Sequence, residues 1–331
     1  MTRVAVPLEL SPQALRPRGE HPVEFGGPTM GVVWSVKAFA PASLDVEPIR
    51  AKVQALLNGV IAQMSNWEPA SQLSQFNHAP AGAWLDLPPG FLHVMQRALL
   101  WAELSGGAFD PAAGRLVDLW GFGPPGPVST PPTAAQIEAA MATGGWDRLA
   151  LTGARMFQPG GLHLDLSGIA KGFGVDDVSR ALSHLGLADH LVEIGGELRG
   201  AGVKPDGEPW LVEIETPPDA AFPAGPIRVA LHGLSIATSG DYRRFLDHDG
   251  RRYSHTLDPR IGRPIANGLR SVSVIAAECI DADALCTALS VLGPREGLDF
   301  AVRHEVAAHF LVDTGEGLSE IVTPALEAML A

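Results

Sequence analysis

Hydrophobic residues recur over residues 46–64 at the spacing of an amphipathic helix. The apolar positions, three or four residues apart and therefore on one helical face, are Val46, Ile49, Val53, Leu56, Leu57, Val60, Ile61 and Met64. Asp45 or Ser43 can cap the start of this helix, and Pro48 is tolerated in its first turn. The alternation of residue types over 32–39 instead predicts a strand with one buried face.

Further helices and short strands are predicted along the rest of the chain. The expected helices span 89–104, 133–141, 169–185, 281–292 and the C-terminal end. The expected strands span 162–166, 191–194, 210–215, 227–231 and 271–276. There is no regular alternation of strands and helices with a Gly-rich dinucleotide turn, which argues against a Rossmann fold. The pattern therefore predicts an α+β fold with two lobes around a cleft.

The domain organisation is predicted from the segments without periodicity. Residues 1–25 are rich in proline and arginine and are expected to form an irregular N-terminal arm. Residues 26–331 are expected to form the folded domain. Within it, 121–132 (GFGPPGPVSTPP) is the candidate boundary loop between the two lobes.

Composition and charge narrow the range of partners. The 331 residues are 46% hydrophobic and 18% charged, as in ordinary globular proteins. A formal net charge of -13 argues against nucleic acid as a partner. An anionic substrate would need a metal ion, a helix N-terminus or a few placed cations. The only cysteines, Cys279 and Cys286, form neither a metal-ligand pattern nor a disulfide framework and are expected to be small buried side chains.

No window of the sequence is apolar enough for a membrane span. The N-terminus also lacks the apolar run of about 7–15 residues that a secretory signal contains. A cytoplasmic location is therefore expected for the sequence as written. The alternative is a periplasmic location, if a leader precedes this sequence in the native gene.

Asp283 and Thr287 are four residues apart and share one face of the helix predicted there. Their carboxylate and hydroxyl are hard oxygen ligands, which suit Mg²⁺ or Ca²⁺. The alternative is structural: Asp281 or Asp283 caps the helix, and Thr287 bonds back to the helix backbone.

A second set of polar residues follows a predicted strand, where Asp165 is succeeded by Ser167, Gly168 and then Lys171 in the first turn of a helix. A helix start offers free N–H groups to an anion, and lysine adds a positive charge. Gly168 would allow a ligand or metal to approach its carbonyl closely. The alternative is a helix capped by the aspartate and serine, with a solvated lysine.

His255 lies in a Gly- and Pro-punctuated stretch and could act as an acid or base near neutral pH. The alternatives are a structural histidine and a plain turn at Asp258-Pro259. Residues 106–111 (GGAFDP) predict a tight loop that could grip a nucleobase, and Gly195-Gly196 predicts either a ligand contact or a hairpin turn. Met30 and Trp67 each suggest core packing when taken alone, and their role as ligand walls comes only from the resemblance described next.

Eight segments in this order resemble the ApbE family of FAD:protein FMN transferases. They run from Gly27 to Gly293 and cover roughly four-fifths of the chain. The segments are GPTMGVVWSV, MSNWEPASQLSQFN, GGAFDPAAGRLVDLWGFGP, LDLSGIAKGFGVD, EIGGELRGAG, ATSGDYRRF, YSHTLDPRIGRPI and ADALCTALSVLG. The resemblance implies a two-lobed α+β fold with mixed or antiparallel sheets, flanking helices and a flavin cleft between the lobes.

The resemblance also implies a role for individual residues. Mg²⁺ would be held by Asp283, Thr287 and the main-chain carbonyl of Gly168, with Asp283 also counted as catalytic. His255 would assist proton transfer. The residues implied for FAD are Met30, Trp67, Ala108, Phe109, Asp110, Asp165, Lys171 and the main chain at Leu257.

The implied activity is a Mg²⁺-dependent transfer of FMN from FAD to a Ser or Thr hydroxyl of an acceptor protein, with release of AMP. The product would be a covalently flavinylated protein, and the family's acceptors are typically subunits of bacterial redox complexes. Many relatives are exported lipoproteins with a cysteine after a signal peptide, which this sequence lacks. The alternatives are a Mg²⁺-dependent FAD pyrophosphatase that yields FMN and AMP, and a non-catalytic flavin-binding protein.

Overall fold

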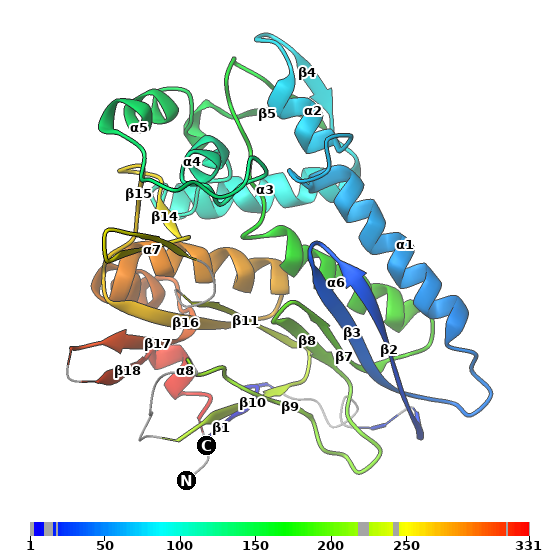
Figure 1. Cartoon of the computed structure of the whole chain (residues 1–331). Helices are drawn as coiled ribbons and strands as arrows, with labels where there is room; N and C mark the ends of the chain where they lie inside the picture. Colours follow the sequence, from blue (N-terminus) through cyan, green and yellow to red (C-terminus); the bar gives the residue numbers. More distant parts are fainter. Residues whose placement is uncertain are drawn as a thin grey trace.

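An eight-stranded antiparallel sheet forms the middle of the protein (Figure 1). The computed structural model describes residues 3–9, 16–17, 19–217, 225–240, 245–315 and 317–330. The strands lie in the order β18-β17-β16-β11-β8-β7-β3-β2. Their bounds are β2 His21–Thr29, β3 Val32–Ala40, β7 Asp189–Ile194, β8 Glu197–Ala201, β11 Leu234–Gly240, β16 Leu269–Ala276, β17 Ala307–Asp313 and β18 Leu318–Val322.

Helices cover one face of this sheet and a smaller sheet covers the other (Figure 1). The helices are α1 Glu47–Met64, α6 Ala170–His184 and α7 Cys279–Arg303. The smaller sheet consists of β1 Arg3–Ala5, β9 Trp210–Glu213 and β10 Ile227–Leu231, and α8 Pro324–Glu327 packs beside it. Because apolar side chains line both faces of the central sheet, the protein has a layered core.

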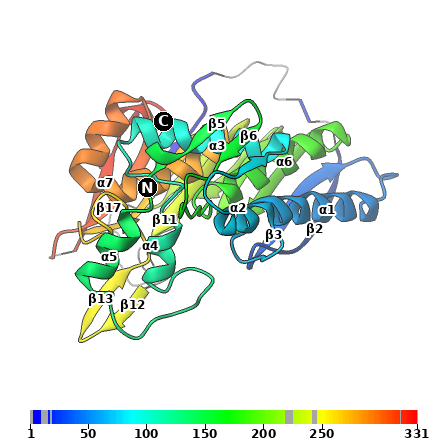
Figure 2. The ribbon, with the colours of Figure 1, turned by 90° about the horizontal axis from the view of Figure 1, so that it is seen from above.

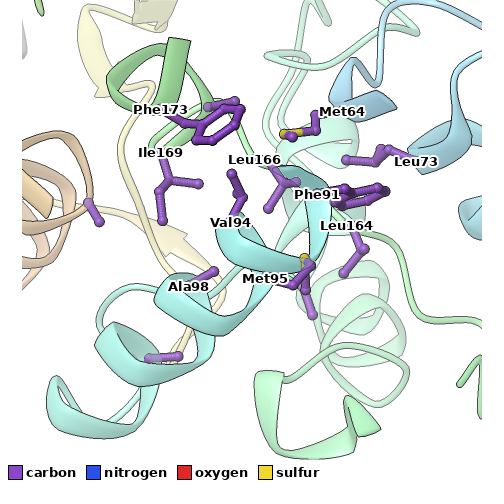
Figure 3. Close-up of a cluster of buried hydrophobic side chains, with 14 of the residues drawn as sticks. Met64, Leu73, Phe91, Val94, Met95, Ala98, Leu164, Leu166, Ile169 and Phe173 are labelled. Carbon is purple, nitrogen blue, oxygen red and sulfur yellow. The ribbon is translucent and has the colours of Figure 1, made fainter. Parts of the chain in front are cut away.

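A third layer lies on the outer side of the helices and contains the core cluster drawn in Figure 3. It consists of α2 Gln72–His78, α3 Pro89–Leu104, β4 Trp84–Asp86, β5 Ala150–Thr152 and β6 Arg155–Phe157. Phe91 and Met95 of α3 are fully buried there against Leu164 and Ile169, which precede α6. This packing fixes the chain segment that leads into α6.

The remaining elements gather on one side of the molecule, away from α1 (Figure 2). They are α4 Gly114–Leu119, α5 Ala134–Met141, η2 Trp146–Arg148, β12 Phe245–His248, β13 Arg251–Ser254, β14 Leu257–Asp258 and β15 Arg263–Pro264. Leu116, Trp120, Phe122, Ile137 and Leu257 form their common core. No helix in the described ranges is long and apolar enough to cross a membrane.

The α+β class is confirmed. The predicted helices form, and local sequence signals explain where they begin and end. In α1 a proline occupies the first turn and Asp45 accepts a hydrogen bond from the N–H of Glu47 at 3.1 Å. In α5, Thr133 and Gln136 form a capping box. The helix predicted over 281–292 ends at Gly293, whose φ of 74° interrupts α7.

The strand predicted over 162–166 does not form. The alternating leucines are buried, but side-chain amides replace a strand partner. The N–H of Leu164 donates to Asn77 at 2.7 Å, and the N–H of Leu162 donates to Gln158 at 3.1 Å. Because these amides satisfy the backbone of a buried segment, it remains extended with a single β-bridge, between Ala113 and His163.

The irregular arm predicted over 1–25 is only partly irregular. Arg3–Ala5 forms β1 and pairs in parallel with β10, and His21 begins β2. The partner of β1 lies far away in the sequence, whereas β2 pairs with the adjacent strand β3 across a short turn. Residues 121–132 form no helix or strand, as expected, and their role as a boundary between two lobes stays a prediction.

Candidate functional site

The first turns of α6 and α7 lie directly against each other because Gly172 is at their contact. A Cβ atom on Gly172 would lie 2.3 Å from the carbonyl oxygen of Cys279 and 2.8 Å from the Cα of Ile280. Only a residue without a side chain permits this approach. The contact places Lys171 Nζ 3.7 Å from Asp283 Oδ1, so the two predicted motifs meet.

A residue of α6 caps α7. Asp176 accepts hydrogen bonds from the N–H groups of Cys279 and Ile280, each at 2.9 Å. Burial raises the pKa of Asp176 to about 6, against the lowering effect of these hydrogen bonds. The structural alternative in which Asp281 or Asp283 caps the helix is therefore wrong, and Asp283 is available for another role.

The three residues predicted to hold a metal lie together at this contact. Asp283 and Thr287 are one turn apart on α7, and the hydroxyl oxygen of Thr287 lies 2.7 Å from the position of a Cβ on Gly168. Asp283 is buried, and its Oδ2 accepts a hydrogen bond from the N–H of Gly172 at 2.9 Å. A carboxylate, a hydroxyl and a nearby main-chain segment are the kind of hard ligands that Mg²⁺ takes.

Lys171 lies between two buried carboxylates. Its Nζ is 2.5 Å from Glu197 Oε1, so the alternative of a solvated lysine is wrong. Burial lowers the pKa of Lys171, but Asp283 and Glu197 together raise it above its usual value. Burial raises the pKa of Glu197 to about 7 although Lys171 opposes the shift, and burial likewise raises the pKa of Asp283.

This cluster has the electrostatics of a cation site. Two carboxylates and one ammonium leave one net negative charge when all are ionised. Glu197 Oε2 is buried and finds no hydrogen-bond partner in the described part of the chain. A buried excess negative charge favours a bound cation. Within the described residues, no group of three or more His, Cys, Asp or Glu side chains could hold a metal. The carboxylate of Asp283 and the neutral hydroxyl oxygen of Thr287 are ligands that suit a hard ion.

Glu197 and Asp176 are residues that sequence reasoning missed. Glu197 follows the Gly195-Gly196 pair, which forms the predicted hairpin turn, with φ values of 61° and 104°. An acidic residue directly after such a turn was the available signal. Asp176 stands between Val175 and Asp177 in the sequence, and no comparable signal marked it.

Asp165 joins the end of α1 to the start of α6. Its Oδ2 accepts a hydrogen bond from the side chain of Asn66 at 3.1 Å, and its Oδ1 accepts one from the N–H of Ser167 at 2.7 Å. Asp165 therefore holds the turn that precedes α6. The alternative of a helix capped by Asp165 and Ser167 is wrong, because the N-cap residue of α6 is Ile169 and no side chain caps the helix. Trp67, next to Asn66, is 56% exposed, so the interpretation of Trp67 as a core residue is wrong.

The predicted nucleotide loop lies beside the start of α6. Ala108 and Phe109 are buried, and the Phe109 ring lies 3.6 Å from the position of a Cβ on Gly168. Asp110 accepts hydrogen bonds from the N–H groups of Ala112 at 2.7 Å and Trp146 at 3.3 Å. Burial raises the pKa of Asp110 to about 6.

Met30 forms the turn between β2 and β3 with a φ of 46° and packs against two core clusters. Its terminal methyl lies 3.4 Å from the position of a Cβ on Gly174 in α6. The side chain of Met30 is therefore partly buried, and its buried part packs in the core, as the interpretation of Met30 as a core residue expected.

His255 and Leu257 lie on the segment between β13 and β15. The His255 ring stands edge-on to Phe122, with 6.3 Å between the ring centroids. The Leu257 side chain is buried in the core beside α4, so only its main chain is available to a ligand. Asp241, Tyr242, Arg243 and Arg244 of the segment ATSGDYRRF (237–245) lie outside the described residues.

Two cavities flank these elements. One of about 430 Å³ contains Asp110 and the indole of Trp146, together with Arg148 and Arg260. The other, of about 580 Å³, lies between α1, α3, α6 and α7 and contains none of the predicted site residues. The arginines of this larger cavity are already ion-paired with acids at α6 and α7. The start of α6 is therefore the better candidate for a site that binds a charged ligand.

Comparison with known proteins places this chain in a defined class of protein. An FAD:protein FMN transferase from Vibrio cholerae is 36% identical over 311 residues, which are 93% of this chain and 93% of that protein. The one from Haemophilus influenzae is 33% identical over 324 residues, 95% of this chain and 93% of that protein.

Solved structures agree with this class. The crystal structure of the Pseudomonas stutzeri flavinyl transferase ApbE, apo form, has a TM-score of 0.87 at 39% identity and covers 94% of this chain and 97% of its own. The flavin transferase ApbE from Vibrio cholerae has a TM-score of 0.86 at 35% identity, covering 93% and 99%. A sequence model of the ApbE family matches residues 30–310. The chain belongs to the ApbE family.

Proposed function

We propose that this protein is a Mg²⁺-dependent FAD:protein FMN transferase. It takes FAD, attaches the FMN half to a serine or threonine hydroxyl of an acceptor protein and releases AMP. The relatives' names support this activity. The observation that carries it is the buried cluster of Lys171, Asp283 and Glu197 where α6 and α7 begin, because this cluster suits a cation beside a diphosphate.

The flavin dinucleotide would lie across the start of α6. Backbone N–H groups at a helix start and the positive charge of Lys171 favour a phosphate there. The exposed ring of Trp67 offers a flat surface to an aromatic ligand, and Met30 lies beside α6. Asp110 and Asp165 on the flanking loops would orient the nucleotide through its hydroxyl and amine groups.

Asp283, Thr287 and the carbonyl of Gly168 would hold Mg²⁺. When bound, the ion supplies charge neutralisation for the diphosphate and for the leaving AMP. Lys171 adds a second positive charge at a fixed position. In a protein of net charge -13, these groups make a site for an anion.

The transfer exchanges one phosphorus–oxygen bond for another. The acceptor hydroxyl oxygen bonds to the FMN-side phosphorus, and the bond from that phosphorus to the bridging oxygen breaks, so AMP leaves with the bridging oxygen. His255 would accept the hydroxyl proton. Because the chemistry mainly requires alignment and charge neutralisation, a rigid contact between α6 and α7 serves it well. The acceptor would be a flavin-accepting protein such as a subunit of a bacterial redox complex.

The test is mass spectrometry of an acceptor domain that bears a Ser or Thr site, after incubation with the protein, FAD and MgCl₂. With the native protein as enzyme, we expect the mass of the acceptor domain to rise by one FMN. With the Asp283→Ala variant, we expect no flavinylated acceptor. Asp281→Asn is the matched control, because this acid lies on the same helix but pairs with Arg97 at 2.6 Å. The control variant should retain the activity.

Two outcomes would replace the proposal. Free FMN and AMP without flavin on the acceptor would indicate a pyrophosphatase, in which water takes the place of the hydroxyl. Bound FAD without release of AMP would indicate a flavin carrier. Full activity in Asp283→Ala would remove the metal assignment.

A further inference from the structure

Glu197 is a buried carboxylate that forms an ion pair with Lys171. It begins β8, its side chain is 6% exposed, and its Oε1 lies 2.5 Å from Lys171 Nζ. Its Oε2 is buried and has no hydrogen-bond partner among the residues that the structure describes. An ion pair in such a place contributes little to stability, because removing two charges from water offsets most of their attraction. Fold stability is therefore a weak reason for a glutamate at this position.

The two contacts of Lys171 are unequal. Its ammonium is 2.5 Å from Glu197 and 3.7 Å from Asp283 Oδ1, so Glu197 holds it off the second carboxylate. The other oxygen of Asp283 already accepts the N–H of Gly172. Asp283 Oδ1 is therefore the oxygen that a divalent cation can approach, provided that the ammonium keeps its distance.

We propose that Glu197 is a positioning residue that anchors Lys171 and so keeps Asp283 Oδ1 open for the divalent cation. The inference rests on the proposed function, because it takes Asp283 as a ligand of Mg²⁺. Without the charge on Glu197, the nearest carboxylate for the ammonium is Asp283. The ammonium then moves onto Oδ1 and competes with the cation for the same oxygen.

The test is calorimetric titration of the protein with MgCl₂ alone, followed by transfer kinetics at varied Mg²⁺. Glu197→Gln keeps the shape of the side chain and removes its charge. We expect it to bind Mg²⁺ about tenfold more weakly, equivalent to about 1.4 kcal/mol. We expect the Mg²⁺ concentration for half-maximal rate to rise similarly, while kcat at saturating Mg²⁺ stays within about threefold.

Glu320→Gln is the matched control. Glu320 is also a partly buried carboxylate in an ion pair, with Arg3 at 2.7 Å, and it lies on β18 outside the site. It should show the stability cost of losing a buried charge with unchanged Mg²⁺ affinity. If Glu197→Gln does not fold, Glu197→Asp provides the second variant. It retains the charge but shortens the side chain by one methylene, and it should weaken Mg²⁺ binding in the same direction.

A double-mutant cycle separates positioning from a direct effect of charge. In a Lys171→Met background no ammonium remains to move, so adding Glu197→Gln should change Mg²⁺ affinity much less than it does in the native protein. An equal loss in both backgrounds would overturn the inference, because Glu197 would then act on the ion itself. Native Mg²⁺ affinity in Glu197→Gln would overturn it as well.

The failure of this inference is distinguishable from failure of the proposed function. A native protein that binds Mg²⁺ and transfers FMN, with a Glu197→Gln variant of unchanged affinity, contradicts only the role of Glu197. A native protein that binds Mg²⁺ without transferring FMN contradicts only the function. A native protein that does not bind Mg²⁺ contradicts both.

Discussion

Gly172→Ala tests whether the approach of α6 to α7 depends on one missing side chain. The added methyl would lie 2.3 Å from the carbonyl oxygen and 2.7 Å from the carbonyl carbon of Cys279, and 2.8 Å from the Cα of Ile280. All three are backbone atoms, so the helices themselves must separate. Overpacking of this kind costs about 3 kcal/mol, at the upper end of the usual range.

Helix propensity acts in the opposite direction at Gly172. Replacing a helical glycine by alanine stabilises a helix by about 0.5–1 kcal/mol. The net expectation is a free energy of unfolding lower by about 2 kcal/mol. Gly59 provides the matched control, because it lies inside α1 and nothing lies within 4 Å of its Cβ position. Gly59→Ala should therefore stabilise the protein by about 0.5–1 kcal/mol.

Urea unfolding followed by tryptophan fluorescence measures both variants, and their midpoints should shift in opposite directions. Mg²⁺ titration adds a functional reading, because separation of the helices removes the hydrogen bond from Gly172 to Asp283. Equal stability of the two variants would refute the argument, since it would mean that no close backbone contact exists at Gly172.

Two further predictions concern histidines. His255→Ala should lower the rate of FMN transfer at saturating FAD by about 10²-fold or more while FAD affinity changes little, as expected for a proton acceptor; the reverse pattern in transfer kinetics and FAD titration would make His255 a binding residue. For His190, burial lowers the pKa from 6.5 to about 4, and its ring contacts Ser179 Oγ and the Leu187 carbonyl oxygen, each at 2.7 Å. The His190 imidazole is protonated at a higher pH in the unfolded chain than in the folded protein. The free energy of unfolding should therefore fall by up to about 3 kcal/mol as pH drops from 6.5 to about 4. His190→Gln should remove this part of the slope in urea unfolding measured across that range, and an unchanged slope would show that His190 is not held neutral.

Local signals predicted most of the helices and several strands correctly. Residues 46–64 and 89–104 have apolar periods and terminal signals that need no distant partner, and α1 and α3 follow them closely. The strand predicted over 162–166 failed because side-chain amides satisfy its backbone, one from Asn77, far away in the sequence, and one from Gln158, four residues before Leu162. A period-2 pattern indicates which side chains are buried, but not what accepts the hydrogen bonds.

The candidate site was predicted in part. Asp283, Thr287, Gly168 and Lys171 could be selected from motifs, and the structure brings them to the start of α6 and α7. Their roles as metal and nucleotide ligands stay predictions. Glu197 was not selected, because an acid directly after a hairpin turn does not reveal that the Lys171 ammonium lies 2.5 Å from it.

The sequence by itself determined the class of fold, the positions of the main helices and the motifs that resemble the ApbE family, because periodicity, capping and motif order are local properties of the chain. Only the tertiary structure decided that α6 and α7 touch at Gly172, that Asp176 caps α7 from outside and that Glu197 restrains Lys171. These contacts join residues about 26 to 111 positions apart. Their energies depend on distance and burial, which exist only once the chain has folded.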